Sequence, residues 1–190
     1  MAQICEIYDH YVDYSCSVPE IDRLTVQDMV QRHRTIRKNK FPFIVACERG
    51  GKVPSRNKKK NQQGEELILP DRVIGFAYAD DYHDLRGMYR FAAEAEVYTH
   101  SAYFMKGVAK CLLDKLMGLM DQGYMERGGF DIVGDDLDGT GASRVIQNII
   151  IHLPYEKPER LEWVSRWLTE WLEFKQVGHL EDIGNKNEKR

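Results

Sequence analysis

The sequence predicts an α/β (α+β) fold in which a mixed, mainly antiparallel β-sheet is flanked by helices. Two patterns predict it. Four segments repeat apolar residues at helical spacing, and the segments between them are short and either apolar or strictly alternating. The expected order is helix, helix, strand, strand, strand, helix, strand, helix, strand. A chain of 190 residues, of which 43% are hydrophobic, is long enough to bury a substantial core as a single domain spanning residues 1–190.

Two helices are expected before the first strand. Residues 2–14 place apolar side chains on one helical face: Ile4, Tyr8, Tyr11 and Val12. Thr25 begins the second helix, and Asp28 three residues later completes an approximate capping box. The apolar side of this helix continues through Met29, Val30, His33 and Ile36.

A hairpin with a long insertion is expected next. Residues 41–48 and 72–79 are short and apolar, which predicts two antiparallel strands. Residues 49–70 between them are rich in Gly, Pro, Asn, Gln and basic residues and cannot bury a face, so they predict a mobile loop.

The second half alternates strands and helices. Residues 89–98 alternate strictly and predict a strand, and Gly107 precedes a helix with an apolar stripe of Val108, Leu112, Leu116, Leu119 and Met120. The later elements are expected as follows: a loop insertion at 122–143, a buried strand at 144–151, a helix from Pro158 and a final strand at 174–180. Trp163, Trp167 and Trp171 recur every fourth residue of that helix and predict a core or subunit contact.

Composition excludes several functions. The net charge of −3 does not favour a nucleic-acid binder, and no run of 18 apolar residues predicts a membrane span. No secretory signal is visible and the four cysteines form no CxxC pair, which predicts a cytoplasmic protein with reduced thiols. The six histidines form no HxxxH or HExxH motif, so no metal is expected.

The most informative segment is 94–113. It predicts a strand, a short loop and then the sequence KGVA (106–109) at a helix start. A helix N-terminus offers free N–H groups and a positive dipole end to an anion, and Gly107 allows the backbone to approach it closely. An ordinary helix start with a convenient glycine explains the same residues.

The order of motifs resembles the GCN5-related N-acetyltransferase (GNAT) superfamily, and within it the phosphinothricin/methionine sulfoximine acetyltransferase branch. The helix start resembles the acetyl-CoA signature of that superfamily. Gly107 and Ala109 match the signature, whereas Phe104 stands where the family has Gln or Arg. The other resembling segments are 7–12, 75–78, 94–98, Phe174, 178–180 and 183–186. The strands with which family members begin and end have no counterpart in these 190 residues.

The resemblance implies direct transfer of acetyl from acetyl-CoA to a primary amine of a small molecule, such as an amino acid or its analogue. It assigns Glu94, with Glu96 as the alternative, as the base that removes the amine proton. The implied cofactor-binding residues are Tyr98, Thr99, Phe104, Met105, Lys106, Gly107, Val108, Ala109 and Ser165. The implied substrate-binding residues are Tyr82, Arg86 and Tyr89, with Arg86 holding the acid group of the acceptor. Glu162 stands where the family has Asn.

Two other functions stay open from the sequence. One is a protein or peptide N-acetyltransferase, and the other is a non-catalytic module that binds acyl-CoA or a partner. The expected partners are a small-molecule amine and a second copy of the chain in a homodimer, with neither nucleic acid nor membrane.

Overall fold

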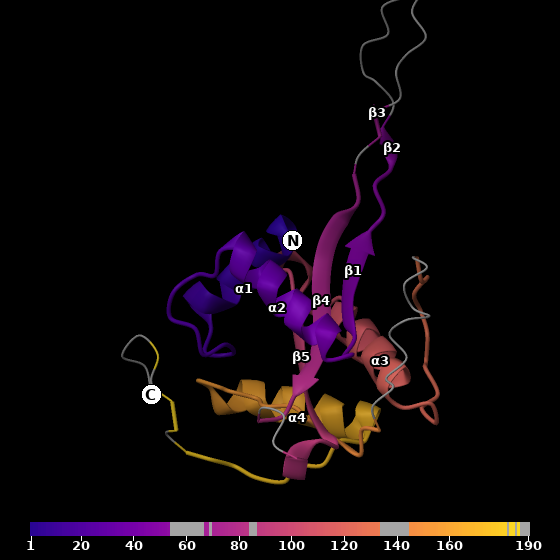
Figure 1. Ribbon diagram of the computed structural model, residues 1–190. Coiled ribbons are helices and arrows are strands. Elements are labelled where there is room, and N and C mark those ends of the chain that lie inside the picture. The colour runs from indigo at the N-terminus through magenta and orange to yellow at the C-terminus, as the bar shows by residue number, and fades with distance from the viewer. Residues whose placement is uncertain are drawn as a thin grey trace, which may run out of the picture.

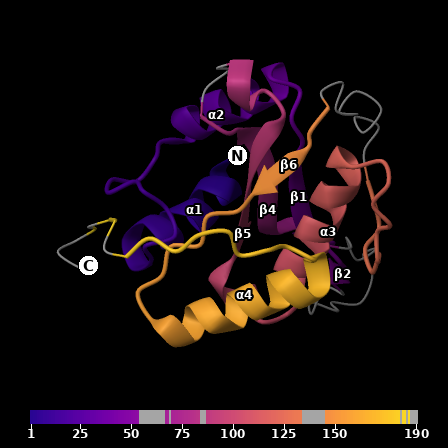
Figure 2. The same cartoon turned by 90° about the horizontal axis from the view of Figure 1, so that it is seen from below.

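The computed structural model describes residues 1–53, 67–68, 70–83, 87–133, 145–181, 183, 184 and 186. A central sheet separates two groups of helices (Figure 1). Helices α1 (Ala2–Tyr14) and α2 (Val26–Lys38) cover one face, and α3 (Val108–Met120) covers the other (Figure 2). Helix α4 (Pro158–Leu172) lies across the lower end of the sheet in Figure 1.

The sheet is mixed, with the order β1-β4-β5-β6. Strands β1 (Phe43–Glu48), β4 (Arg72–Asp81) and β5 (Ala92–Thr99) pair antiparallel, whereas β6 (Asn148–Ile150) pairs parallel with β5. The predicted pairing of the first two strands is confirmed. Two-residue strands β2 (Lys52–Val53) and β3 (Leu67–Ile68) also pair, so the expectation of a loop throughout 49–70 is wrong at these positions. Residues 54–66 and 69 lie outside the described residues.

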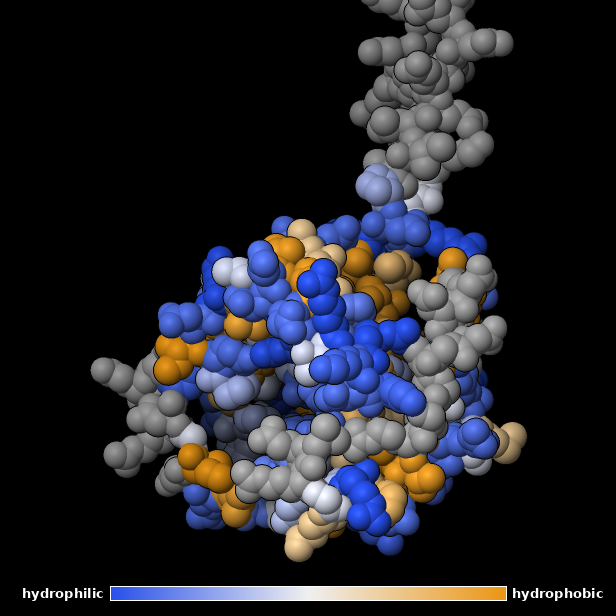
Figure 3. All heavy atoms as spheres, viewed as in Figure 1, coloured by the Kyte–Doolittle hydropathy of each residue, from blue (hydrophilic) through white to orange (hydrophobic). Residues whose placement is uncertain are grey.

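The first two helices form as the sequence predicts. The four expected core residues of α1 are all buried, and so are Met29 and Ile36 of α2. The capping box at Thr25 is complete, because the Asp28 N–H donates to Thr25 Oγ1 at 3.2 Å and the Thr25 N–H donates to Asp28 Oδ2 at 2.9 Å. Mainly hydrophilic side chains cover the outer side of α2 (Figure 3).

Helix α3 packs closely against β4 at Gly75. A Cβ atom at this position would lie 3.0 Å from side-chain atoms of both Val108 and Leu112, and 2.9 Å from the Tyr98 carbonyl oxygen. The absence of a side chain therefore brings the first turns of α3 against the sheet. Leu112, Leu116 and Met120 of the predicted stripe are buried there.

Three strand predictions are wrong in extent. The strand expected at 89–98 begins at Ala92, because 87–89 form the 3-10 helix η1 (Gly87–Tyr89). The buried strand expected at 144–151 is reduced to β6, none of whose residues is buried, and residue 144 lies outside the described residues. Within the described part of the chain β6 pairs on one side only. Residues 174–180 form no strand, since no neighbouring strand pairs with them, and Val177 is 94% exposed.

Helix α4 begins at Pro158 as predicted. Trp163 is 48% exposed, so it does not belong to the core, whereas Leu168 and Leu172 are buried. Among the described residues, no helix has the length and apolar character required to cross a membrane.

Candidate active site

Strands β5 and β6 diverge after Glu94. Their parallel ladder ends with the pair Glu94 and Ile150, and in the part of the chain that the structure describes no strand pairs with the rest of β5 on that side. The His100 N–H donates to the Ile74 carbonyl at 2.9 Å, which fixes the alternation of the β4–β5 ladder. The N–H and C=O groups of Val97 and Thr99 therefore face the open side.

The hydroxyl of Tyr11 occupies the far end of this open edge. It donates to the Thr99 carbonyl and accepts from the Thr99 N–H, both at 2.9 Å. Both backbone groups of Thr99 are thereby satisfied. By the same alternation, Ala95 and Val97 are the other residues beyond Glu94 whose backbone faces this side, and Val97 is the one further from the end of β6.

Glu94 lies at the point of divergence and pairs with His152. The Nδ1 atom of His152 is 2.5 Å from Glu94 Oε1. An ionised carboxylate only accepts hydrogen bonds, so Nδ1 is the donor in this contact and Nε2 is the ring nitrogen that does not face Glu94. The His152 side chain is 58% exposed, which leaves the ring accessible to a substrate.

Sequence reasoning did not find His152. The signal was present, because a polar residue directly follows the apolar run 149–151 of the strand that pairs with Glu94. The parallel register that brings the two side chains together cannot be read from the sequence.

Glu96 lies two residues further along the same face of β5, in a more enclosed environment. The Tyr78 hydroxyl donates to Glu96 Oε2 at 2.6 Å, and the Tyr98 hydroxyl donates to the same atom. Burial raises the pKa of the Glu96 carboxyl, and the nearby charge of Glu94 adds to this effect. The structure thus places the two candidate bases in different surroundings.

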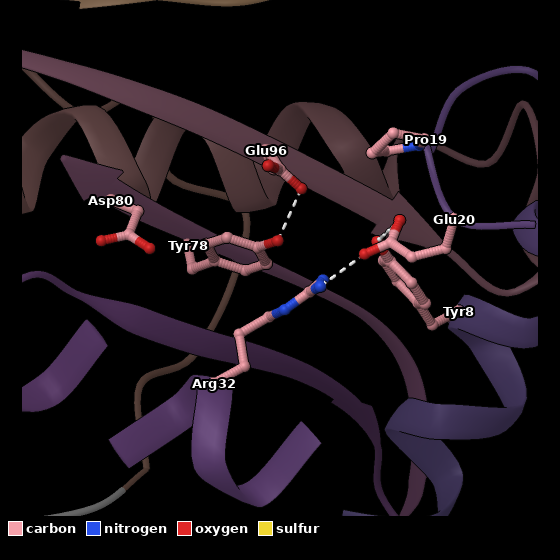
Figure 4. Close-up of a pocket in the computed structure, with 7 residues that line it drawn as sticks. All are labelled: Tyr8, Pro19, Glu20, Arg32, Tyr78, Asp80 and Glu96. Carbon is pink, nitrogen blue, oxygen red and sulfur yellow. Dashed lines mark hydrogen bonds and ion pairs between the residues drawn. The ribbon is translucent and has the colours of Figure 1, made fainter. Parts of the chain in front are cut away.

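A pocket of about 240 Å³ lies beside Glu96, between the sheet and the first two helices (Figure 4). Its lining residues are Tyr8, Pro19, Glu20, Arg32, Tyr78, Asp80 and Glu96. Arg32 Nη2 lies 2.5 Å from Glu20 Oε1, and the Tyr8 hydroxyl donates to Glu20 Oε2 at 2.7 Å. None of these residues except Glu96 was singled out as a site residue from the sequence.

The predicted cofactor-binding loop precedes α3. Gly107 has a φ of +83°, which a residue with a side chain rarely adopts, and no side chain caps the helix that follows. Phe104 and Met105 are exposed, and Lys106 Nζ lies 4.8 Å from the centre of the Tyr103 ring. The first N–H groups of α3, those of Val108 and Ala109, have no partner within the helix.

One of the other predicted residues, Tyr82, lies close to the Glu94–His152 pair, and Tyr89 lies next to Tyr82. The Tyr82 ring centre is 5.7 Å from that of Tyr89 and 6.2 Å from that of His152. Arg86 lies outside the described residues. Ser165 lies on α4, where its carbonyl accepts a bond of 2.9 Å from the Thr169 hydroxyl.

Comparisons with solved structures identify the fold. A ribosomal-protein-alanine N-acetyltransferase from Brucella melitensis matches with a TM-score of 0.65 and 16% identity, covering 100% of this chain and 86% of that one. A putative acetyltransferase from Salmonella typhimurium, solved with its cofactor acetyl-CoA, matches with a TM-score of 0.64 and 18% identity, covering 98% and 80%.

A phosphinothricin acetyltransferase of the GNAT superfamily from Sinorhizobium meliloti, solved with acetyl-CoA, is 29% identical over 62% of this chain and 52% of that one. Its TM-score of 0.48 is too low to support the predicted branch. No family model and no curated protein matches the chain. At the level that the solved structures establish, the chain has the fold of the N-acetyltransferases.

Proposed function

We propose that the protein is an acetyl-CoA-dependent N-acetyltransferase that transfers acetyl directly to the primary amine of a small molecule. The observation that carries the proposal is the Glu94–His152 pair at the point where β5 and β6 diverge. The pair lies beside the open strand edge, and Glu96, two residues from Glu94, lines a partly open pocket. The small volume of that pocket favours a small molecule over a peptide chain.

The described residues fit acetyl-CoA at two places. The uncapped N-terminus of α3 offers backbone N–H groups and the positive end of the helix dipole to the pyrophosphate, and Lys106 adds positive charge. The free N–H and C=O groups of Val97 suit the amide groups of the pantetheine arm, which would extend the sheet as a short added strand. When bound, acetyl-CoA supplies the thioester carbonyl carbon that the amine attacks.

The Glu94–His152 pair supports the removal of the amine proton. An ammonium group is not a nucleophile, so it must lose a proton before it attacks. Glu94 holds His152 in the tautomer whose Nε2 is free, and it stabilises the ring once Nε2 has accepted that proton. The two residues therefore act as one base, in which Glu94 orients His152. The aromatic ring of Tyr82 lies beside His152, and the Tyr89 ring contacts Tyr82.

The test combines binding with turnover. Wild-type protein titrated with acetyl-CoA in a calorimeter should bind it at micromolar concentration, and thiol release with small amines should report transfer. Glu94→Gln and His152→Gln should each lower kcat by about 100-fold or more while acetyl-CoA binding stays unchanged. Glu170→Gln, an exposed carboxylate on α4, is the matched control and should behave as wild type.

Unchanged turnover in both site variants would remove the pair from the mechanism. Absence of acetyl-CoA binding by the folded protein would overturn the proposed function itself. The amino-acid acceptor, the homodimer and the role of Arg86 remain predictions from the sequence.

A further inference from the structure

The pocket beside Glu96 has an unequal balance of charges. Three of its seven lining side chains are carboxylates, Glu20, Asp80 and Glu96, and one is a guanidinium, Arg32. Glu20 and Arg32 form an ion pair at 2.5 Å, so they neutralise each other. Asp80 and Glu96 are therefore the charges to be balanced.

Arg32 is the cation that acts on these two carboxylates, because its charge lowers the pKa of both, but its ion pair is with Glu20, which leaves one guanidinium for three carboxylates. The Asp80 Oδ1 atom accepts the N–H of Asp81 at 2.8 Å, and Glu96 accepts only tyrosine hydroxyls. Neither residue takes part in an ion pair within the described part of the chain. Burial raises the pKa of both carboxyl groups by more than their hydrogen bonds and the Arg32 charge lower it.

The aromatic side chains of the pocket also suit a cation. The Tyr8 ring already stacks with a guanidinium, since the Arg32 Cζ atom lies 5.1 Å from the ring centre. The Tyr78 side chain of β4 also lines the pocket, and its hydroxyl is directed at Glu96 (Figure 4). Aromatic faces together with carboxylates form the surroundings that organic ammonium groups prefer.

The strand register connects the pocket with the reacting position. Asp80 is directly opposite Glu94, and Tyr78 is directly opposite Glu96, so these side chains project from the same face of the sheet. Positions two apart on a strand are separated by about 7 Å. One amine of a short acceptor can therefore lie at the Glu94–His152 pair while a second group of the same molecule enters the pocket.

We infer that the acceptor is a primary amine that carries a second positive charge, as in a short diamine, and that Asp80 and Glu96 bind this second ammonium group. The inference rests on the proposed function. The sequence predicts an acceptor that carries an acid group, whereas this inference predicts an acceptor that carries a second ammonium group in its place.

Three amines with the same four-carbon chain test the inference. They are 1,4-diaminobutane, 1-aminobutane and 4-aminobutanoate, whose far ends are an ammonium, a methyl and a carboxylate group. Each is titrated in a calorimeter into wild-type protein saturated with CoA. The diamine should bind at least about tenfold more tightly than 1-aminobutane, because it alone forms charge-assisted hydrogen bonds in the pocket, and the amino acid should bind most weakly.

A variant pair locates the effect. Asp80→Asn should weaken diamine binding about tenfold and leave 1-aminobutane binding unchanged. Glu170→Gln removes one negative charge from an exposed position on α4, which does not line the pocket, and should leave the binding of both amines unchanged. The wild-type series does not depend on the folding of either variant.

Binding of 1-aminobutane or 4-aminobutanoate as tight as that of the diamine would overturn the inference. Acetylation of all three amines at equal efficiency would also overturn it and leave the proposed function standing. Selective binding of the diamine without acetyl transfer in the presence of acetyl-CoA would keep the pocket assignment and refute the proposed function.

Discussion

Two carboxylates on one face of β5 have different chemical roles because their neighbours differ. Glu94 is at the edge where β6 ends, and it contacts an accessible imidazole. Glu96 faces the first two helices and accepts hydrogen bonds from two tyrosines. A change of environment over two residues thus separates the proposed proton-transfer position from the proposed ligand-binding position.

The raised pKa of Glu96 has a consequence for stability. The folded-state pKa is above the ordinary value of 4.5, so ionisation of Glu96 opposes folding. This cost is absent at low pH, develops as the pH rises through the interval between the unfolded-state and folded-state pKa values, and is complete above that interval. Glu96→Gln cannot ionise, and its amide oxygen still accepts a tyrosine hydroxyl.

Urea unfolding of wild-type protein and of Glu96→Gln, between about pH 4 and about pH 8, should therefore show Glu96→Gln gaining stability relative to wild type as the pH rises. For the exposed Glu170→Gln variant, the difference in unfolding free energy from wild type should stay constant over the same pH range. A difference between Glu96→Gln and wild type that falls with pH would contradict the assignment.

At the scale of elements, the position of α3 is set by a missing side chain. Gly75 of β4 allows Val108 and Leu112 to contact the strand directly, and the same helix presents its free N-terminus beside β5. The proposed cofactor site and the packing of the hydrophobic core therefore depend on the same close approach.

Gly75→Ala should test this approach. The new Cβ would be 2.9 Å from a backbone oxygen, which cannot move as a flexible side chain can, so the helix must shift. We expect a loss of about 1–3 kcal/mol in the free energy of unfolding together with weaker acetyl-CoA binding. Gly51→Ala, where nothing lies within 4 Å, should leave both unchanged. Wild-type stability and affinity in Gly75→Ala would show that α3 is not held by this contact.

At the scale of the whole molecule, segments distant in the chain are joined by polar side chains inside the fold. Asp114 of α3 is fully buried and accepts the Tyr124 hydroxyl and the N–H groups of Arg127 and Gly128 at 2.8–3.0 Å. Arg127 in turn lies 4.9 Å from the ring centre of Trp171 on α4. One carboxylate thereby anchors residues 124–128, which follow α3.

Asp114→Asn should be strongly destabilising. The amide offers one oxygen where the carboxylate offers two, and its NH₂ group faces buried donors, so we expect a loss of at least about 2 kcal/mol in urea unfolding. Asp121→Asn is the matched control, because that carboxylate accepts a single N–H, of Gly123, in an exposed turn. Equal stability of the two variants would refute the anchoring role.

Features that depend on neighbouring residues could be predicted from the sequence more fully than features that depend on contacts between distant segments. The helices at 2–14 and from Thr25 follow from apolar spacing and capping, which act within a few residues. The alternation of β5 placed Glu94 and Glu96 on one face. His152, Arg32 and Asp80 could not be assigned, because their roles depend on the register of β6 and on how α2 packs, and neither leaves a local signal.

The tryptophans of α4 report on the first turn of α3. Lys110 of that turn lies 5.4 Å from the ring centre of Trp171 and 6.0 Å from that of Trp167. Indole emission depends on the charges around the ring, so an anion that attracts the Lys110 ammonium group away from the rings changes the fluorescence. The chain therefore contains an intrinsic optical probe of the proposed cofactor site: we expect CoA to alter the emission of wild-type protein and to leave that of a Lys110→Met variant unchanged.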